Sequence, residues 1–437
     1  MRKIIVRNVG PIKDAQLELK KINILIGQQS TGKSTLAKIA CFCSWVEKEI
    51  SIAQSPAAFE AKNYFADNLT KFHKLSGYLS KQSVITFTSE ALSFEYANNR
   101  FLFQWNEGRL NYRRSKTLYI PAERNIVSVI PNWFEVNLEF NNTRSFLADW
   151  ETVRKYFSKE NPLSILDIGK YYHNTSDNSD HIITKENKDI LMESASSGLQ
   201  TLVPLQALIQ YYGYDYYNVG LKWKESNVNM QKKMYRLYEN ILYQLLNSLS
   251  DEEKAAWESK KTKIFKENSD ISLLPEEVRR GLIFPNPEIE NQYTKIASRF
   301  QYPSSTAFFI EEPELNLYPV AQYKLVNILV KMVNEMHHSL FITTHSPYIL
   351  TSLNNLIYAG EVGKQHHKET DHVVPHNLWI SKDHVSAWKI DADTNMLENL
   401  QADDLSILRA EELDDVSEII NNKFGELFEI AHQSKEE

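Results

Sequence analysis

One eight-residue stretch combines the residue types that hold a phosphate group. Gly27-Gln-Gln-Ser-Thr-Gly-Lys-Ser34 follows the pattern GxxxxGK[ST] and lies between an apolar run and a predicted helix. Its glycines let the chain curl so that backbone N–H groups point inward at a β-phosphate. Lys33 then reaches the β- and γ-phosphates, and the Ser34 hydroxyl binds Mg²⁺. The predicted nucleotide-binding residues of this phosphate loop are Gly27, Gln28, Gln29, Ser30, Thr31, Gly32, Lys33, Ser34 and Thr35.

Two adjacent carboxylates have the position that phosphoryl transfer requires. Glu311 and Glu312 follow the apolar run 308–310, so they stand at the end of a predicted buried strand. Carboxylates in such a place hold the Mg²⁺ shell and orient the water that attacks the γ-phosphate. We expect Glu311 to bind Mg²⁺, directly or through water, and Glu312 to act as the general base.

A histidine ends another apolar run. His345 follows the residues 341–344, and a single histidine after a strand is more often structural than catalytic. Because this chain also has the phosphate loop and the acidic pair, a catalytic role is favoured over a structural one, and we expect His345 to contact the γ-phosphate. The predicted catalytic residues are therefore Glu312, His345 and Lys33.

A fourth stretch, Ser194-Ala-Ser-Ser-Gly-Leu-Gln200, opens a helix predicted over 199–211. Its small residues leave backbone N–H and hydroxyl groups exposed at a helix N-terminus, where an anion binds favourably. The same string could cap any helix. Its place in the chain, after the phosphate loop and before the acidic pair, favours a functional role.

The elements that must position these residues are predicted to form one sheet. Runs that are apolar throughout and separated by helical segments are typical of a parallel sheet covered on both faces. Such runs occur at 22–26, 117–120, 307–310, 340–343 and 355–358. A helix over 34–50 follows the phosphate loop. Three shorter runs, 84–88, 92–96 and 100–105, predict an antiparallel meander.

Two regions do not fit the sheet pattern. Residues 140–190 are polar and rich in Asn, Ser and Asp, so we expect loops with a helix. In the second region, 211–302, apolar residues recur at helical spacing over 230–249. This favours one amphipathic helix in a helical subdomain. A short arm for self-assembly is the alternative, although about three heptads are too few to establish a coiled coil.

Together these motifs resemble the ABC-ATPase family, in its branch of SMC, repair and OLD-like proteins and bacterial AAA-labelled ATPases. The segments YIPAERN (119–125) and EEPELNLYP (311–319) are also typical of that branch. The resemblance implies an α/β fold: a P-loop ABC-ATPase head with a mostly parallel sheet, helices on both faces, an antiparallel β subdomain and helical insertions. The expected parts are an N-terminal lobe (1–139, with a short helical insertion at about 51–82), a loop and signature region (140–210), a helical insertion (211–302) and a C-terminal lobe (303–437).

In this family two heads enclose two ATP molecules, and each nucleotide contacts the phosphate loop of one head and the signature of the other. The resemblance therefore implies ATP and Mg²⁺ as cofactors and a homodimer or larger homo-oligomer. It also implies that Ser196, Ser197 and Gly198 contact the γ-phosphate of the partner's nucleotide. Residues 316–318 would touch the opposite protomer. Glu123 and Arg124 lie near the family's Q-loop, where this chain has no convincing glutamine.

The bulk composition narrows the class of protein. With 42% hydrophobic and 11% aromatic residues among 437, the chain can build a core. A net charge of −7 argues against a surface devoted to nucleic acid, but not against a local basic groove. The only cysteines, Cys41 and Cys43, form no disulfide framework. The sequence shows neither a signal peptide nor a membrane span, so we expect a cytoplasmic protein without a membrane partner.

Other candidate sites receive a simpler interpretation. Asp391 and Asp393 form a DxD like that of Toprim nucleases, but they lie in a predicted β-hairpin, and no nuclease domain is expected. Four histidines between 366 and 376 are interpreted as a solvated loop rather than a zinc site. The tyrosines of 211–217 are expected to pack a helix end, and the basic residues of 260–280 to form a mixed, solvated face.

The resemblance thus predicts an ATPase that dimerises around Mg-ATP and controls a separate effector nuclease or toxin, as in anti-phage systems of the Septu or PARIS kind. Two alternatives stay open. One is a DNA repair or recombination ATPase that acts on DNA. The other is a slowly hydrolysing, nucleotide-loaded scaffold or sensor that holds a toxin or nuclease until triggered.

Overall fold

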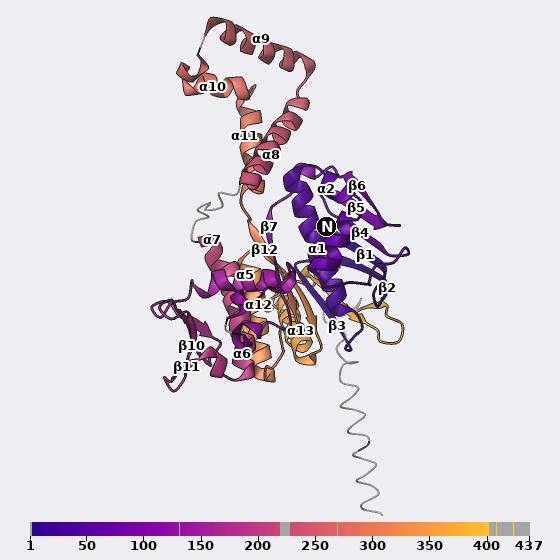
Figure 1. Ribbon diagram of the computed structural model, residues 1–437, viewed down its shortest axis with the longest axis vertical. Coiled ribbons are helices and arrows are strands. Elements are labelled where there is room, and N and C mark those ends of the chain that lie inside the picture. Colours follow the sequence, from indigo (N-terminus) through magenta and orange to yellow (C-terminus); the bar gives the residue numbers. More distant parts are fainter. Residues whose placement is uncertain are drawn as a thin grey trace, which may run out of the picture.

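A six-stranded sheet forms the centre of the head (Figure 1). The structure, a computed structural model, describes residues 2–130, 132–218, 228–268 and 270–401, together with Leu408 and Lys423. The strand order is β15 (Leu397–Asn399), β14 (Val385–Ile390), β3 (Ile22–Gly27), β13 (Ser339–Thr344), β12 (Ser305–Glu311) and β7 (Ser115–Ile120). Neighbouring strands run parallel except at the β14–β15 hairpin. The predicted parallel sheet is therefore confirmed.

The two faces of this sheet pack against different partners, because successive side chains of a strand point to opposite sides. Phe308 and Ile310 of β12 join a core that includes α5 (Asn142–Arg154), α6 (Ser197–Gln210), α12 (Pro319–Glu335) and α13 (Pro347–Val362). Ala307 and Phe309 join a second core with α1 (Lys33–Ala53) and the antiparallel sheet. A strand buried on both faces explains why these runs are apolar throughout.

The antiparallel sheet of the N-terminal part has the order β2 (Ile12–Leu19), β1 (Arg2–Val9), β4 (Val84–Thr88), β5 (Leu92–Ala97) and β6 (Arg100–Trp105). The meander expected from the three short alternating runs is confirmed. Short helices α2 (Ala57–Glu60) and α3 (Tyr64–Phe72) follow α1. A third short helix, α4 (Ile126–Val129), follows β7. The architecture is thus α/β, with a mainly parallel sheet, helices and an antiparallel β subdomain.

The strand expected at 355–358 is wrong, since these residues lie inside α13. Pro347 occupies the first turn of that helix, and the Ser346 side chain accepts a hydrogen bond from the backbone N–H of Tyr348. Its buried residues, including Leu350, Leu353 and Ile357, recur at helical spacing. A short apolar run does not distinguish a buried helix from a strand, and here the spacing of the flanking residues decides for the helix.

Residues 140–190 hold more structure than the predicted loops and helix. After α5, four strands form an antiparallel sheet in the order β11 (Asp189–Leu191), β10 (Ser179–Thr184), β9 (Gly169–Asn174) and β8 (Leu163–Ile165). These strands were missed because polar side chains pair with each other across them. Asp180 accepts hydrogen bonds from the Tyr171 hydroxyl (2.7 Å) and from Arg154 (3.2 Å). Such partners replace the apolar residues on which a strand prediction depends.

Four helices form an arm that projects from the head (Figure 1). They are α8 (Val228–Asn247), α9 (Asp251–Glu267), α10 (Glu276–Ile283) and α11 (Pro287–Gln301). The amphipathic pattern belongs to α8, which packs against α11 through Leu237, Ile241 and Phe300. The same cluster contains Ile52 of α1 and Tyr112, so the arm is anchored on the N-terminal part of the head. The domain limits at 139, 210 and 302 stay predictions, and residues 219–227 and 269 lie outside those that the structure describes.

Candidate functional site

The phosphate loop connects the end of β3 to the start of α1. Gly32 has a φ of +104°, which an L side chain rarely adopts, and its carbonyl accepts the first backbone hydrogen bond of α1, from Leu36 (2.9 Å). A Cβ atom at Gly27 would lie 2.7 Å from the carbonyl oxygen of Ile390 at the end of β14. Both glycines are thus required by the path of the loop, and not only by a ligand.

The loop curls around the ammonium group of Lys33. The Lys33 Nζ donates to the carbonyl oxygens of Gly27 (2.8 Å) and Gln28 (2.6 Å) and lies 3.4 Å from the His345 Nδ1. Burial lowers the pKa of Lys33 to about 8, although Glu312 and Glu314 act in the opposite direction. A cation held at the centre of a glycine-bounded loop at a helix N-terminus fits a phosphate group.

Glu311 ends β12 and is buried. Its Oε1 accepts a hydrogen bond from the Tyr119 hydroxyl, and the Ala122 backbone N–H lies 3.4 Å from its Oε2. The Lys38 ammonium of α1 is 4.0 Å away. Burial, and then the carboxylate of Glu311, raise the pKa of Tyr119 well above its usual range. Sequence reasoning missed Tyr119, although the segment 119–125 had been singled out.

Glu312 and His345 face each other. The His345 Nε2 lies 3.3 Å from the Glu312 Oε1, and both side chains are partly open to solvent. Glu312 has a φ of +44°, a conformation that turns the chain sharply after β12. The other ring nitrogen of His345 lies near the Lys33 ammonium group, so the His345 ring stands between Lys33 and Glu312. The structure thus brings Lys33, His345 and Glu312 together.

Glu314 joins the loop after β12 to the end of β13. Its Oε1 accepts hydrogen bonds from the Thr344 hydroxyl and from the His345 backbone N–H, both at 2.7 Å. Its Oε2 is buried without a hydrogen-bond partner among the described residues. Sequence reasoning gave Glu314 no role. Its position shows that it fixes the backbone that presents His345.

Arg124 connects the acidic turn to the signature helix. It is 0% exposed, and its guanidinium group donates to the carbonyl oxygens of Glu311 (2.9 Å), Glu312 (2.8 Å) and Thr201 (3.2 Å). It also lies within 3.4 Å of the carbonyl oxygens of Pro121 and Pro313. Burial lowers the pKa of Arg124 to about 10, against the raising effect of nearby carboxylates led by Glu314. Arg124 therefore holds backbone and has no place on the nucleotide-facing surface.

The signature residues lie at the exposed start of α6. Ser196 is the N-cap, and both Ser196 and Ser197 are exposed. The Gln200 side chain closes the preceding turn by donating to the carbonyl oxygens of Glu193 (2.8 Å) and Ala195 (3.1 Å). A Cβ atom at Gly198 would lie 2.9 Å from the carbonyl oxygen of Asn316. No hydrogen bond of the described residues joins this turn to the phosphate loop of the same chain.

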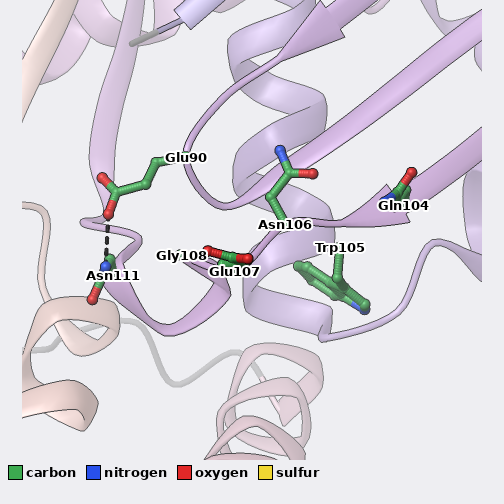
Figure 2. Close-up of a pocket in the computed structure, with 7 residues that line it drawn as sticks. All are labelled: Glu90, Gln104, Trp105, Asn106, Glu107, Gly108 and Asn111. Carbon is green, nitrogen blue, oxygen red and sulfur yellow. Dashed lines mark hydrogen bonds between the residues drawn. The ribbon is translucent and has the colours of Figure 1, made fainter.

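A separate cavity of about 610 Å³ lies at the edge of the antiparallel sheet (Figure 2). Its lining comes from Glu90, Gln104, Trp105, Asn106, Glu107, Gly108 and Asn111. Glu90 accepts a hydrogen bond from the Asn111 side chain at 2.6 Å. The cavity holds carboxylates and no lysine or arginine, so it offers no favourable charge to a phosphate. None of the predicted site residues lies in it.

The side chains of the other candidate sites make structural contacts within the fold. Asp391 stands in the β14–β15 hairpin, where its carboxylate accepts hydrogen bonds from the turn. The Tyr212 hydroxyl donates to Asp149 (2.9 Å), so the tyrosine cluster packs the end of α6. The rings of His367 and His376 lie 4.7–5.0 Å from each other and from Trp379.

Within the described residues, no three His, Cys, Asp or Glu side chains are grouped as a metal site would require, and no helix is long and apolar enough to cross a membrane.

The comparisons with known proteins give one match to a protein family. The family described as an AAA ATPase domain matches residues 294–350, which contain Glu311, Glu312 and His345. No curated protein sequence matches the chain. The family match supports an ATPase, and it covers the acidic pair and the histidine that the geometry places beside the phosphate loop.

Solved structures give distant likenesses that span most of the chain. The SMC head domain from Thermotoga maritima is 8% identical, covers 92% of this chain and 98% of its own, and has a TM-score of 0.36. The Smc head domain from Pyrococcus furiosus, bound to the C-terminal domain of ScpA, is 8% identical over 96% of this chain and 100% of its own, with a TM-score of 0.35. The recombination mediator protein RecF is 10% identical over 91% and 97%, with a TM-score of 0.28.

Proposed function

We propose that this chain, an ATPase that resembles the SMC and OLD-like ABC proteins, hydrolyses Mg-ATP between two copies of itself and thereby controls a partner effector. The observation that carries the proposal is the line of Lys33, His345 and Glu312 beside the buried Glu311. All four stand at the carboxyl ends of adjacent parallel strands or on the loop that follows β3, which is where ligands bind in open α/β sheets.

The donors at this site fit Mg-ATP. The loop 27–35 would hold the phosphates through its backbone N–H groups and Lys33, and Ser34 with Glu311 would hold the Mg²⁺ ion. Bound Mg²⁺ neutralises charge that develops on the phosphates. Glu312 would accept the proton of the attacking water, and His345 would orient that water or the γ-phosphate. Tyr119 and Glu314 would keep Glu311 and the His345 backbone in place.

The pKa of Lys33 leads to a pH dependence of ATP binding. A pKa near 8 means that the ammonium loses its proton as the pH rises through 8. Only the charged form attracts a triphosphate, so we expect ATP affinity to fall about fivefold to tenfold between pH 7.5 and 9. Equilibrium binding in Mg²⁺ buffer measures this, and affinity that stays constant across the range would contradict the assignment of Lys33.

The surface around the signature supports an interface between two copies. Tyr318, 77% exposed, and the exposed Val320 and Tyr323 follow Asn316, which touches the signature turn. Large apolar side chains grouped on one surface usually mark an interaction site. Together with the exposed Ser196 and Ser197, they support a head-to-head arrangement in which each signature meets the partner's nucleotide.

The arm is placed where closure of two heads around ATP could be transmitted to an effector. Its α8 end packs near Ile52 at the end of α1, which begins at the phosphate loop, and α11 leads into β12, which carries Glu311. Both attachments thus belong to elements that carry nucleotide-binding residues. The effector itself, a separate nuclease or toxin in a defence system, is inferred from the family resemblance.

The DNA-repair alternative has weaker support at the arm. Some of the basic residues of α9 and α10 are paired with carboxylates, since Lys261 pairs with Glu258 at 3.0 Å and Arg280 pairs with Glu290. A nucleic-acid surface would keep such cations free for phosphates. Stimulation of ATP turnover by duplex DNA would favour the repair function over effector control.

A mixing experiment tests the shared site directly. Lys33→Ala should disable the phosphate loop, and Ser197→Arg should block the signature, so each variant alone should lose ATP hydrolysis. In a 1:1 mixture about half of the dimers are heterodimers with one intact composite site, so about a quarter of wild-type activity should return. A mixture as inactive as its components would show that the signature does not act across an interface.

A further inference from the structure

A second cavity, of about 850 Å³, lies close to the predicted magnesium ligand but outside the phosphate loop. It is lined by residues of α1, α3, β7 and α5 (α1, β7 and α5 are labelled in Figure 1). Tyr119 forms part of its wall, and the hydroxyl of the same tyrosine donates to Glu311. Whatever occupies this cavity therefore lies one side chain away from the acidic turn.

The charged side chains of the cavity are mainly lysines. Lys48, Lys62 and Lys71 have no hydrogen-bond or ion-pair partner for their ammonium groups within the part of the chain that the structure describes, whereas Lys116 pairs with Asp149 at 2.9 Å. Asp67 is the other carboxylate of the lining. Burial is the main effect that lowers the pKa of Lys48; Glu49 acts against it, and Lys116 and Arg114 act in the same direction as burial. An anion would balance this excess of positive charge.

The walls between these lysines are aromatic. Phe42, Trp45, Phe72 and Phe140 line the cavity, and the rings of Phe72 and Phe140 lie 5.5 Å apart. Flat apolar walls with a few charged groups favour a planar aromatic ligand that carries charge at one end. A small inorganic anion would contact the lysines but leave the aromatic walls empty, and an uncharged ring would leave the lysines without a counter-charge.

His73 adds a buried polar atom without a partner. The residue is 1% exposed, and its Nδ1 has no hydrogen-bond partner among the described residues. Burial lowers the pKa of His73 to about 3, so the ring is neutral. A buried polar atom without a partner is destabilising, and the His73 ring also lines the cavity, where it would contact a bound base.

We propose that this cavity binds a small phosphorylated nucleoside, with its phosphate at Lys48 and its base between the aromatic walls near His73. A cavity of about 850 Å³ accommodates a mononucleotide, since ligand sites for small molecules usually measure about 300–1,000 Å³. The site is distinct from the phosphate loop, and none of its lining residues belongs to the residues predicted to hold ATP.

Occupancy of the cavity would be sensed at the magnesium site through Tyr119. The Tyr119 ring lies 5.5 Å from the His73 ring, in an edge-to-face arrangement, and its hydroxyl holds the Glu311 carboxylate. A base bound beside His73 would restrict or shift this ring and so change the position of Glu311. This part of the inference rests on the proposed ATPase function, whereas the binding itself does not.

Calorimetric titration of a full-length Lys33→Ala chain tests the binding, because the disabled phosphate loop does not compete. The probes are AMP, GMP, CMP, UMP and inorganic phosphate. We expect at least one monophosphate to bind, Lys48→Met to weaken it by about tenfold or more, and phosphate alone to bind at least about tenfold more weakly. The matched control Lys81→Ala, at an exposed lysine outside the cavity, should leave the affinity within about twofold.

Binding of no monophosphate at millimolar concentration, equal binding by the Lys48→Met chain, or equal affinity for inorganic phosphate would overturn the proposal. Because Lys48 is only partly exposed, circular dichroism checks the fold of that variant. The exposed pair Lys62→Ala and Lys71→Ala provides a second test at the surface of the cavity.

ATP turnover tests the coupling separately. A saturating monophosphate should change the wild-type rate by about twofold or more, and Tyr119→Phe should abolish this response without abolishing monophosphate binding. Binding without any change in the wild-type rate would overturn the coupling and leave the binding site in place. Since the titration uses a chain that does not need to hydrolyse ATP, failure of the proposed function and failure of the cavity site are distinguishable.

Discussion

Replacing Glu312 with glutamine is expected to reduce ATP hydrolysis by a factor of about 100 or more while ATP binding persists. Glutamine has nearly the same size but does not accept a proton from the attacking water. The Lys33 and Glu311 contacts do not involve the Glu312 side chain, so the nucleotide should remain bound. Trapped nucleotide should hold two copies together, which phosphate release and mass in solution would show in parallel.

A matched control separates this effect from a change in charge. Glu107→Gln removes one carboxylate at an exposed position far from the phosphate loop in sequence and should leave turnover unchanged. Turnover by Glu312→Gln within threefold of the wild type would contradict the assignment of the base. A wild-type protein that retains ATP in a stable assembly and barely turns over would support the scaffold alternative instead.

Replacing Arg124 with methionine is expected to destabilise the head by about 3 kcal/mol or more. Methionine fills similar space but leaves the buried carbonyl oxygens of Glu311, Glu312 and Thr201 without their donor. Removal of a buried cation also relieves its desolvation cost, but it leaves the neighbouring carboxylates without a counter-charge. The loss of several hydrogen bonds together should outweigh that relief.

Thermal unfolding and ATP turnover measure the two consequences of this change. A loss of this size in a chain this long lowers the melting temperature by about 3 °C, and the loosened acidic turn should also lower the rate of ATP turnover. Arg124→Lys keeps the charge but not the planar set of donors, so it should be only partly tolerated. Arg100→Met is the control at an exposed arginine. Unchanged stability of Arg124→Met would show that these carbonyls do not depend on Arg124.

The sequence predicted the parts of the site that follow from the sheet. Glu311 ends β12 and His345 directly follows β13, and adjacent parallel strands bring their carboxyl ends to the same edge of the sheet. Lys33 follows β3 at that edge as well. Local patterns therefore contained both the identity of these residues and the reason that they meet.

The supporting residues could not be predicted in the same way. Arg124 meets Glu312 across 188 positions of the chain, and Tyr119 meets Glu311 across 192. Nothing in the local pattern distinguishes a buried arginine with carbonyl partners from a solvated one. The polar strands β8–β11 were missed for a related reason, since their stability depends on pairs such as Arg154 and Asp180.

The way that the arm leaves and re-enters the head has a consequence for how such proteins diversify. Because α8 and α11 lie side by side at the base, the two points where the arm joins the head stay close together whatever the length beyond them. Insertions at a site of this kind cost little in chain entropy. The outer helices α9 and α10 can therefore be lengthened, shortened or exchanged during evolution or by protein engineering, and the same nucleotide-handling head can be fitted to a new recipient of its signal.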